Sequence, residues 1–401
     1  MRIKILKNNW LYFIFGLAYA VVTFILIGCE FNLSGDYTSH YGMIVNVKND
    51  VEHYSPNFLY YFLARWLSVI SPSFPYFNLD HLGVAMVFIV SLAHFLKFYF
   101  TVLTVKYFLN ERNDLKKSKT FISLISLSLV ILFSIPSYNL YIGRNLYYLG
   151  HLVPMVWHNS TIIVSTPLSI LLFLLSYKQL SEYKMNRNYI ISLLSVLTLL
   201  IKPSFILVYI VVYPLIYFFK YKLSKKYLWG YAPVVFSVLF LVVQYVMIYV
   251  YNIGSIQSEK SKVGFGFLTV WGEFVGVKNI PIVIFTSLMF PLMCLFVFPK
   301  WLIKRDVLFS FSLLLVSVLI FAYLYEIGPR MYHGNFFWQI VPSVYIFFMV
   351  SIIQLIIKAE ELKNRRFYLR LTVYFLSFIY ILHICSGIFY AYRYITQNIY
   401  S

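Results

Sequence analysis

The chain has 401 residues, of which 61% are hydrophobic and 12% are charged, and its formal net charge at pH 7 is +19. A protein so rich in apolar side chains cannot cover its surface with polar groups in water, which excludes a soluble enzyme and indicates a polytopic membrane protein. The excess positive charge might be read as a sign of nucleic-acid binding, but the basic residues stand almost entirely in short connectors between apolar runs. Such connectors face the cytoplasm by the positive-inside rule, so no nucleic-acid partner is needed to explain the charge.

Apolar runs of about 20 residues, each long enough to cross a bilayer, follow one another along the chain. Counted against the basic connectors, they predict about eleven spans, with the N-terminus inside and the C-terminus outside the cell. We therefore expect an all-α polytopic fold that forms one transmembrane domain, residues 1–401. The expected segments are 9–29, 82–106, 120–138, 159–177, 190–201, 203–219, 228–252, 279–298, 307–325, 338–357 and 371–391.

The first apolar run, from Trp10 to Ile27, is followed shortly by the tripeptide Gly35-Asp36-Tyr37. The predicted topology places Asp36 on the outer face of the membrane. A carboxylate held there can serve as a catalytic base. Asp is also a favoured N-cap residue, so Asp36 could instead simply cap the helix that follows.

The first outer loop, residues 30–81, carries charge yet keeps the periodicity of helices. From Tyr41 to Tyr54, apolar residues recur at helical spacing with charged residues on the other side, which predicts a helix lying in the membrane interface. A second interfacial helix is expected from Pro56 to about Ile70, with proline in its first turn and aromatic residues on one stripe. Two such helices after a lone acid are typical of a lid over a catalytic group.

The second expected span contains His94 and Lys97, one helical turn apart. Titratable side chains are costly in lipid, so both should face the interior of the helix bundle. There they could either pack against other side chains or line a cavity.

The dipeptide Lys202-Pro203 divides a long apolar run that has basic residues on both sides. Both flanks can stay inside the cell only if the run turns back, and proline favours a break because it cannot continue the preceding helix. Residues 190–219 are therefore expected to form a short helical hairpin with Lys202 near its tip. There Lys202 could bind an anion, or could simply extend from a helix end to water.

Two further outer segments hold residues that suit sugars and anions. Residues 138–158 combine aromatic side chains with histidines and an arginine, although aromatic residues are also common where helices leave a membrane. The turn from Gly328 to Asn335 brings together Arg, His and Asn, for which a compact turn has little structural need. The candidate binding residues are Arg65, Arg144, Tyr147, Tyr148, His151, His158, Lys202, Arg330 and His333.

Taken together, these motifs resemble the GT-C class of integral-membrane glycosyltransferases, which take sugars from polyprenyl-linked donors at the outer face. The counterparts are Gly35-Asp36-Tyr37 after the first helix, His53-Tyr54-Ser55-Pro56-Asn57 for a His-Pro-Pro-like step, and Leu199 to Ser204 for a Thr-Lys-Pro turn. The likeness covers the first 220 residues. It departs from the family because Asp36 stands alone where an acidic pair is common, and because no soluble C-terminal domain is expected.

The resemblance implies a hexosyltransferase-type glycosyltransferase in the cytoplasmic (inner) membrane of a bacterium. It would move a sugar or repeat unit from a polyprenyl phosphate or diphosphate carrier to a growing surface glycan, as small O-antigen or capsule transferases and polymerases do. Asp36 would accept the proton of the attacking hydroxyl, and the cationic candidates would stabilise the departing phosphate. The partners would be the lipid-linked donor, a glycan or lipid-linked acceptor, and membrane lipids. With so few acidic residues outside, no divalent metal cofactor is expected.

A flippase or transporter for polysaccharide or lipid-linked oligosaccharide is the main alternative. It would also be polytopic and basic inside, but it would need polar residues along its spans, and acids are nearly absent there. A membrane O-acyltransferase would be expected to show an Arg-rich, His-containing first helix, which the run from Trp10 to Ile27 is not. The sequence leaves open the sugar, the linkage, the type of phosphate carrier, and the choice between a single-sugar transferase and a polymerase.

Overall fold

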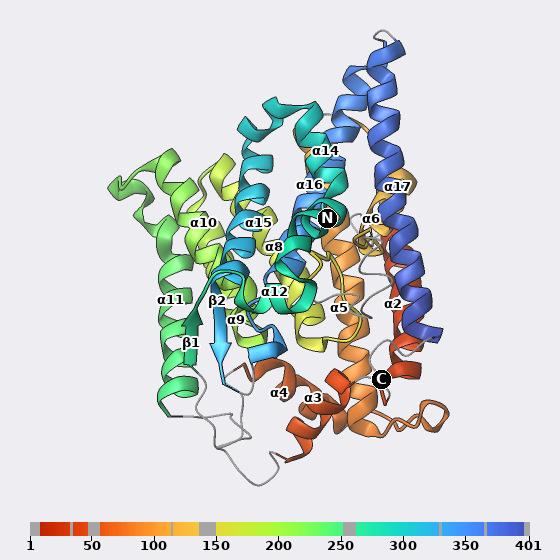
Figure 1. The fold of residues 1–401 in the computed structure, drawn as a ribbon, viewed down its shortest axis with the longest axis vertical. Coiled ribbons are helices and arrows are strands. Elements are labelled where there is room, and N and C mark those ends of the chain that lie inside the picture. Colours follow the sequence, from red (N-terminus) through yellow and green to blue (C-terminus); the bar gives the residue numbers. More distant parts are fainter. Residues whose placement is uncertain are drawn as a thin grey trace.

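A computed structural model of the chain describes residues 9–32, 35–46, 57–113, 115–135, 150–251, 262–328, 331–364 and 367–396. Most of these residues are helical (Figure 1). In the N-terminal half the helices are α2 (Trp10–Glu30), α3 (Gly35–Asn46), α4 (Leu59–Ser68), η3 (Pro75–Phe77), α5 (His81–Lys106), η4 (Tyr107–Arg112), α6 (Lys119–Val130), α8 (Ser160–Ser181) and α9 (Met185–Ile201).

The C-terminal half adds further helices and a two-stranded antiparallel sheet, in which Lys262 is paired with Ile327 and Phe265 with Leu324. Its elements are α10 (Ser204–Tyr221), η5 (Lys225–Tyr231), α11 (Ala232–Tyr245), η6 (Val246–Val250), β1 (Lys262–Phe265), α12 (Thr269–Val275), η7 (Val277–Asn279), α13 (Ile280–Ser287), α14 (Met289–Val297), η8 (Pro299–Ile303), α15 (Arg305–Tyr323), β2 (Leu324–Ile327), η9 (Met331–His333), α16 (Ile340–Glu361) and α17 (Phe367–Thr396).

Among the described residues, eight helices are long and apolar enough to cross a membrane. The chain is therefore a helical, multi-pass membrane protein, as its composition predicts. Every one of the expected segments contains a helix, but three differ from a simple span. The segments α6 and α9 are shorter, and α13 and α14 form a pair bent by 72°.

The expected span over residues 120–138 ends early, since α6 stops at Val130. The non-helical residues that follow dock on α17 through their backbone. The amide of Phe133 donates to the carbonyl of His383 at 3.2 Å, and Ser386 Oγ donates to the carbonyl of Ser134 at 2.6 Å. Irregular backbone is tolerated at this depth because neighbouring helices satisfy its polar groups.

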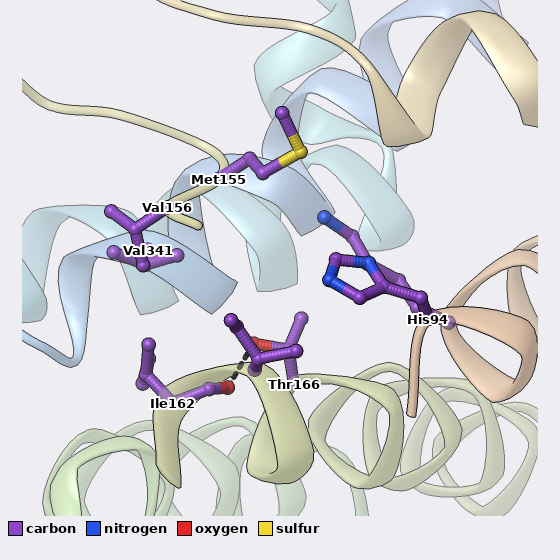
Figure 2. A pocket seen from close by; sticks show the side chains of 8 residues that line it. His94, Met155, Val156, Ile162, Thr166 and Val341 are labelled. Atoms are coloured by element: carbon purple, nitrogen blue, oxygen red, sulfur yellow. Dashed lines mark hydrogen bonds between the residues drawn. The ribbon is translucent and has the colours of Figure 1, made fainter. Parts of the chain in front are cut away.

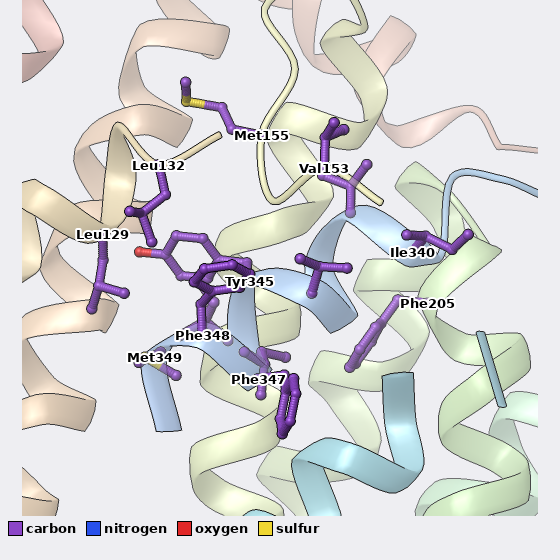
Figure 3. Close-up of a cluster of buried hydrophobic side chains, with 14 of the residues drawn as sticks. Leu129, Leu132, Val153, Met155, Phe205, Ile340, Tyr345, Phe347, Phe348 and Met349 are labelled. Carbon is purple, nitrogen blue, oxygen red and sulfur yellow. The ribbon is translucent and has the colours of Figure 1, made fainter. Parts of the chain in front are cut away.

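The centre of the bundle is α16, which is buried along most of its length. Its large side chains point in several directions, and Figure 3 shows Tyr345, Phe347 and Phe348 surrounded by apolar residues of other segments, including Leu129 and Phe205. A helix that is hydrophobic all round belongs in such a position, whereas α11 and α17 expose one apolar face.

The connectors rich in basic residues meet at one end of the bundle, where the turn between α16 and α17 lies at the top of Figure 1. Lys117 forms an ion pair with Glu360. Lys220 Nζ donates to the carbonyl of Ser181 at 2.9 Å, and Arg305 donates to that of Leu180 at 3.3 Å. Such clustering at one end is expected if the basic connectors share one side of the membrane.

The chain turns back at Lys202-Pro203, so α9 and α10 form a hairpin. The ring of Tyr183, just before α9, lies 6.1 Å from the ring of Tyr221 at the end of α10. The start of α9 and the end of α10 therefore both lie at the basic end of the molecule. Lys202, at the turn between the two helices, lies away from that end.

The two helices that correspond to the expected interfacial helices, α3 and α4, occupy the end opposite the basic connectors (Figure 1). The first one begins earlier than expected, at Gly35, so Asp36 lies in its first turn. Residues 47–56, which include the second half of that expected helix, lie outside the described residues. The second, α4, buries Tyr60 and Tyr61 and exposes Phe62 and Trp66, as an interfacial helix should.

Candidate functional site

Asp36 is held at one end of the bundle by the way α3 is anchored. The neighbouring Tyr37 is fully buried, its ring lies 5.4 Å from that of Phe31, and its hydroxyl donates to the carbonyl of Trp157 at 2.9 Å. Asp36 itself is partly exposed, with 41% of its side chain accessible. A ligand can therefore reach the carboxylate while the backbone beside it stays fixed.

Asn159 joins Asp36 to Lys202. Its Nδ2 donates to Asp36 Oδ2 at 3.2 Å, and its Oδ1 accepts from Lys202 Nζ at 3.3 Å. The same Oδ1 caps α8 by accepting from the amide of Ile162 at 3.1 Å. Lys202 Nζ also donates to Thr161 Oγ1 at 3.0 Å. The amide side chain of Asn159 thus connects a carboxylate and an ammonium group that are far apart in the sequence.

Lys202 stands between α9 and α10 in an extended conformation, which lets its side chain leave both helices. Its ammonium lies 5.1 Å from the ring centre of Trp338, close enough for a cation–π interaction. The ring of His158 lies 5.8 Å from the same tryptophan. The loop before α8, the α9–α10 turn and the residues before α16 therefore meet around one ammonium group.

Two histidines flank this group, the buried His158 and the partly buried His40. His158 Nε2 lies 3.9 Å from Asp36 Oδ2, and burial together with Lys202 lowers the pKa of His158 to about 3. His40 follows Asp36 by one turn of α3, and the same two causes lower its pKa to about 3. Both imidazoles are therefore neutral near pH 7, and the contact between His158 and Asp36 is not an ion pair.

Asp36 and Lys202 shift each other's pKa. Burial raises the pKa of Asp36, and this effect is opposed by Lys202, by the hydrogen bond from Asn159, and by His333. Burial also lowers the pKa of Lys202 to about 8, opposed by Asp36. At neutral pH the arrangement is an ionised carboxylate of increased basicity next to a charged ammonium group.

The structure brings some of the candidate residues together and separates others. Lys202 and His158 lie at Asp36, and His333 is exposed in η9, near enough to affect the pKa of Asp36. His151 is buried elsewhere, with Nδ1 3.5 Å from Ser287 Oγ, and burial lowers its pKa to about 4. Arg65 is exposed on α4. The candidates outside the described residues are Arg144, Tyr147, Tyr148 and Arg330.

Sequence reasoning missed Asn159, Trp338 and His40. Asn159 stands just before Ser160 and Thr161 and an apolar run, a pattern that indicates a helix cap but not a bridge between two distant residues. The position of Trp338 beside Lys202 depends on tertiary packing. Only His40 carried a usable local signal, because residues four apart share a helix face.

Behind the site, His94 and Lys97 face the bundle interior, as their cost in lipid predicts, with exposed fractions of 1% and 4%. The His94 ring stacks on Trp157 at 5.2 Å, and Lys97 Nζ lies 4.2 Å from the ring centre of Tyr345. Figure 2 shows His94, with Thr166 of α8, at a small cavity. Its free volume of about 10 Å³ is near what one water molecule needs.

Within the described ranges, no group of three or more His, Cys, Asp or Glu side chains is arranged to hold a metal ion. Comparison with models of protein families and with curated proteins found no match to this chain.

Proposed function

We propose that the chain is a membrane glycosyltransferase that uses a polyprenyl-linked sugar donor at the outer face of the cytoplasmic membrane. The observation that carries the proposal is the pairing of Asp36 with Lys202 through Asn159. A partly exposed carboxylate beside a partly buried ammonium group suits a reaction in which one group accepts a proton and another receives negative charge.

In the proposed reaction, an acceptor hydroxyl gives its proton to Asp36 while its oxygen attacks the anomeric carbon of the donor sugar. A new carbon–oxygen bond forms as the bond from that carbon to the carrier phosphate breaks, and the bonding electrons leave with the phosphate. Lys202, assisted by His333 at the same end, binds the departing phosphate. The raised pKa of Asp36 favours proton transfer from the hydroxyl.

The interior of the bundle favours the transferase over the flippase alternative. A flippase needs a polar path across the membrane, whereas the described spans pack tightly around α16. The polar groups His94 and Lys97 line a cavity of only about 10 Å³, far too small for a sugar. The polar residues that can meet a ligand lie instead at the end where Asp36 stands.

The central test separates carrier binding from sugar transfer. Asp36→Asn keeps the shape of the side chain but cannot accept a proton, so transfer should fall by about 10²-fold or more. Its affinity for polyprenyl phosphate should stay near that of the wild type. Lys202→Ala should weaken that affinity by about tenfold, because a charge-assisted hydrogen bond to phosphate is lost. Glu182→Gln, at an exposed carboxylate in the basic end, is the matched control and should change neither property.

Two measurements check the expected effects of these variants on carrier binding and on sugar transfer. Binding of polyprenyl phosphate is measured on purified protein in nanodiscs, and transfer is measured as surface glycan restored to cells that lack the gene. Normal glycan with well-expressed Asp36→Asn would remove Asp36 as the base. Two results together would instead support the flippase. The wild-type protein would bind no polyprenyl phosphate, and glycan precursor would accumulate inside cells that lack the gene.

A further inference from the structure

The C-terminal end of α8 gathers three cationic side chains from three other helices. Arg187 belongs to the first turn of α9, Lys220 to the last turn of α10, and Arg305 begins α15. They donate hydrogen bonds to the backbone carbonyls of three consecutive residues, 180–182. The distances are 3.3 Å from Arg305, 2.9 Å from Lys220 and 2.7 Å from Arg187. Three positive charges therefore lie close together at the basic end of the bundle.

The positive charge at this end of α8 exceeds what the helix itself can neutralise. The C-terminus of a helix carries a partial charge equivalent to about half a negative elementary charge, whereas each of the three side chains carries a full positive charge. Glu182 does not offset them, because its carboxylate pairs with the ammonium group of Lys184 at 3.0 Å. The end of α8 thus keeps a positive excess that an anionic ligand can neutralise.

The three cations also keep N–H groups beyond those that the carbonyls use. An ammonium group has three donors and a guanidinium group has five. Within the part of the chain that the structure describes, Arg305 makes one hydrogen bond, to Leu180, and it is exposed. Lys220 and Arg187 are half-buried beside it. Donors are therefore available to a ligand at the surface of this helix end.

Exposed apolar side chains stand next to two of these cations. Phe219 directly precedes Lys220 and is 72% exposed, and Ile303 comes two residues before Arg305 and is 83% exposed. Both α10 and α15 are long and apolar enough to cross a membrane, so their ends lie where lipid headgroups meet acyl chains. A ligand that matches both features has an anionic head and apolar tails.

We propose that Arg187, Lys220 and Arg305 at the end of α8 bind the headgroup of an acidic phospholipid from the membrane leaflet at the basic end of the bundle. The phosphate oxygens accept charge-assisted hydrogen bonds from the three cations, and the acyl chains lie against the exposed apolar side chains beside them. A zwitterionic phospholipid fits less well, because its own ammonium group adds to the positive excess. The proposal does not depend on the glycosyltransferase function, since α3 with Asp36 lies at the opposite end (Figure 1).

The test measures how phospholipids change the thermal unfolding of the full-length protein in a neutral detergent. Phosphatidylglycerol, which is acidic, should raise the unfolding temperature with a saturable midpoint, because a ligand of the folded state stabilises it. Phosphatidylcholine with the same acyl chains should have little effect at the same concentrations. Inorganic phosphate is titrated in the same way. If it protected the protein as well as phosphatidylglycerol does, the site would be one for a soluble anion, and the lipid proposal would be overturned.

Four variants assign the effect to the end of α8. Lys220→Gln and Arg305→Gln each remove one charge and should raise the midpoint concentration by about fivefold. Lys363→Gln is the matched control, because it removes a charge from the exposed turn between α16 and α17, away from α10 in Figure 1. Neither it nor Lys202→Ala should change the midpoint, and the second of these keeps the test separate from that of the proposed function. The midpoint is compared because Lys220 and Arg305 also stabilise α8.

Midpoints that are the same in Lys220→Gln, Arg305→Gln and the wild type would overturn the proposal, and so would an equal increase in Lys363→Gln. A second measurement needs no variant. Native mass spectrometry of the wild-type protein, incubated with equal amounts of phosphatidylglycerol and phosphatidylcholine, should show that more phosphatidylglycerol stays bound. Equal retention of the two lipids would overturn the proposal even if the variants at the end of α8 did not fold.

Discussion

At the level of single residues, the proposed reaction requires two groups to be charged at the same time. The carboxyl group of Asp36 is ionised only above its raised pKa, and the ammonium group of Lys202 keeps its proton only below about pH 8. Burial moves the two pKa values toward each other, since it disfavours the charged form of each group. The interval of pH in which both are charged is therefore narrower than it is for free side chains.

This predicts a bell-shaped dependence of transfer on pH. The rate should rise as the pH increases through the pKa of Asp36, because the base loses its proton, and should fall as the pH passes about 8, because Lys202 becomes neutral. In Lys202→Arg the guanidinium stays charged, so the remaining activity should not decline at alkaline pH. Transfer rates of wild type and variant across this range, with the unfolding temperature at each pH as a control, measure the effect. An unchanged alkaline decline in Lys202→Arg would assign that decline to another group.

The sequence indicates part of this site because charged residues are rare in an apolar chain. Asp36 and Lys202 stand out for that reason, and the structure brings them together with His158 beside them. Asn159 could not be recognised in the same way, since its role depends on where the start of α8 meets the tip of the α9–α10 hairpin. An amide or a tryptophan at a helix end has many structural uses, and only tertiary contacts show which one applies.

At the level of elements, hydropathy predicts that a segment is helical and buried but not where its helix ends. The run over 120–138 is apolar throughout, yet α6 stops at Val130, and the run over 279–298 bends by 72°. In both places the chain departs from a straight helix because other segments satisfy its backbone. The carbonyl of Thr286 on α13, for example, accepts from the amide of Ile135 at 3.2 Å. Such partners lie far away in the sequence and leave no local signal.

The close contact of α17 with the residues after α6 can be tested at Gly387. A Cβ atom built there would lie 1.6 Å from the carbonyl oxygen of Ile131, so Gly387→Ala must push two backbone segments apart. We expect it to destabilise the protein by about 1–3 kcal/mol or more. Gly42→Ala is the matched control because no atom lies within 4 Å of the added Cβ. In a helix it should be neutral or stabilising by up to about 1 kcal/mol.

Thermal unfolding of the two variants in the same detergent measures this difference. Gly387→Ala should unfold at a lower temperature than the wild type, and Gly42→Ala should not. Equal unfolding temperatures would mean that the segment after α6 is not fixed against α17.

At the level of the whole molecule, the two ends of the bundle differ in charge and in the elements that they carry. One end gathers the basic connectors, through contacts such as those of Lys117 with Glu360 and of Lys220 with the end of α8. The other carries α3, α4 and the Asp36 group (Figure 1). The order of basic and apolar segments alone predicts that the basic connectors gather at one end of the bundle, whereas it gives no sign of the bridging residues.

The orientation of these two ends in the membrane is testable with cysteines at exposed positions. Ser224 lies between α10 and η5 at the basic end, and Tyr332 in η9 is 53% exposed at the Asp36 end. In a background without the native Cys29, Cys294 and Cys385, Tyr332→Cys should react with a membrane-impermeant maleimide in intact cells. Ser224→Cys should react only after the membrane is permeabilised, which also shows that its thiol is accessible.

The outcome decides the chemistry of the donor as well as the topology. Polyprenyl-linked sugars are the activated form available outside the cytoplasmic membrane, whereas sugar nucleotides are available inside it. If Ser224→Cys reacted in intact cells and Tyr332→Cys did not, Asp36 and Lys202 would face the cytoplasm. Lys202 could then receive the charge of a departing nucleotide phosphate just as well as that of a lipid phosphate, because its ammonium group recognises the phosphate and not the group attached to it. Reaction of Tyr332→Cys alone would leave the lipid-linked donor as the form that can reach Asp36.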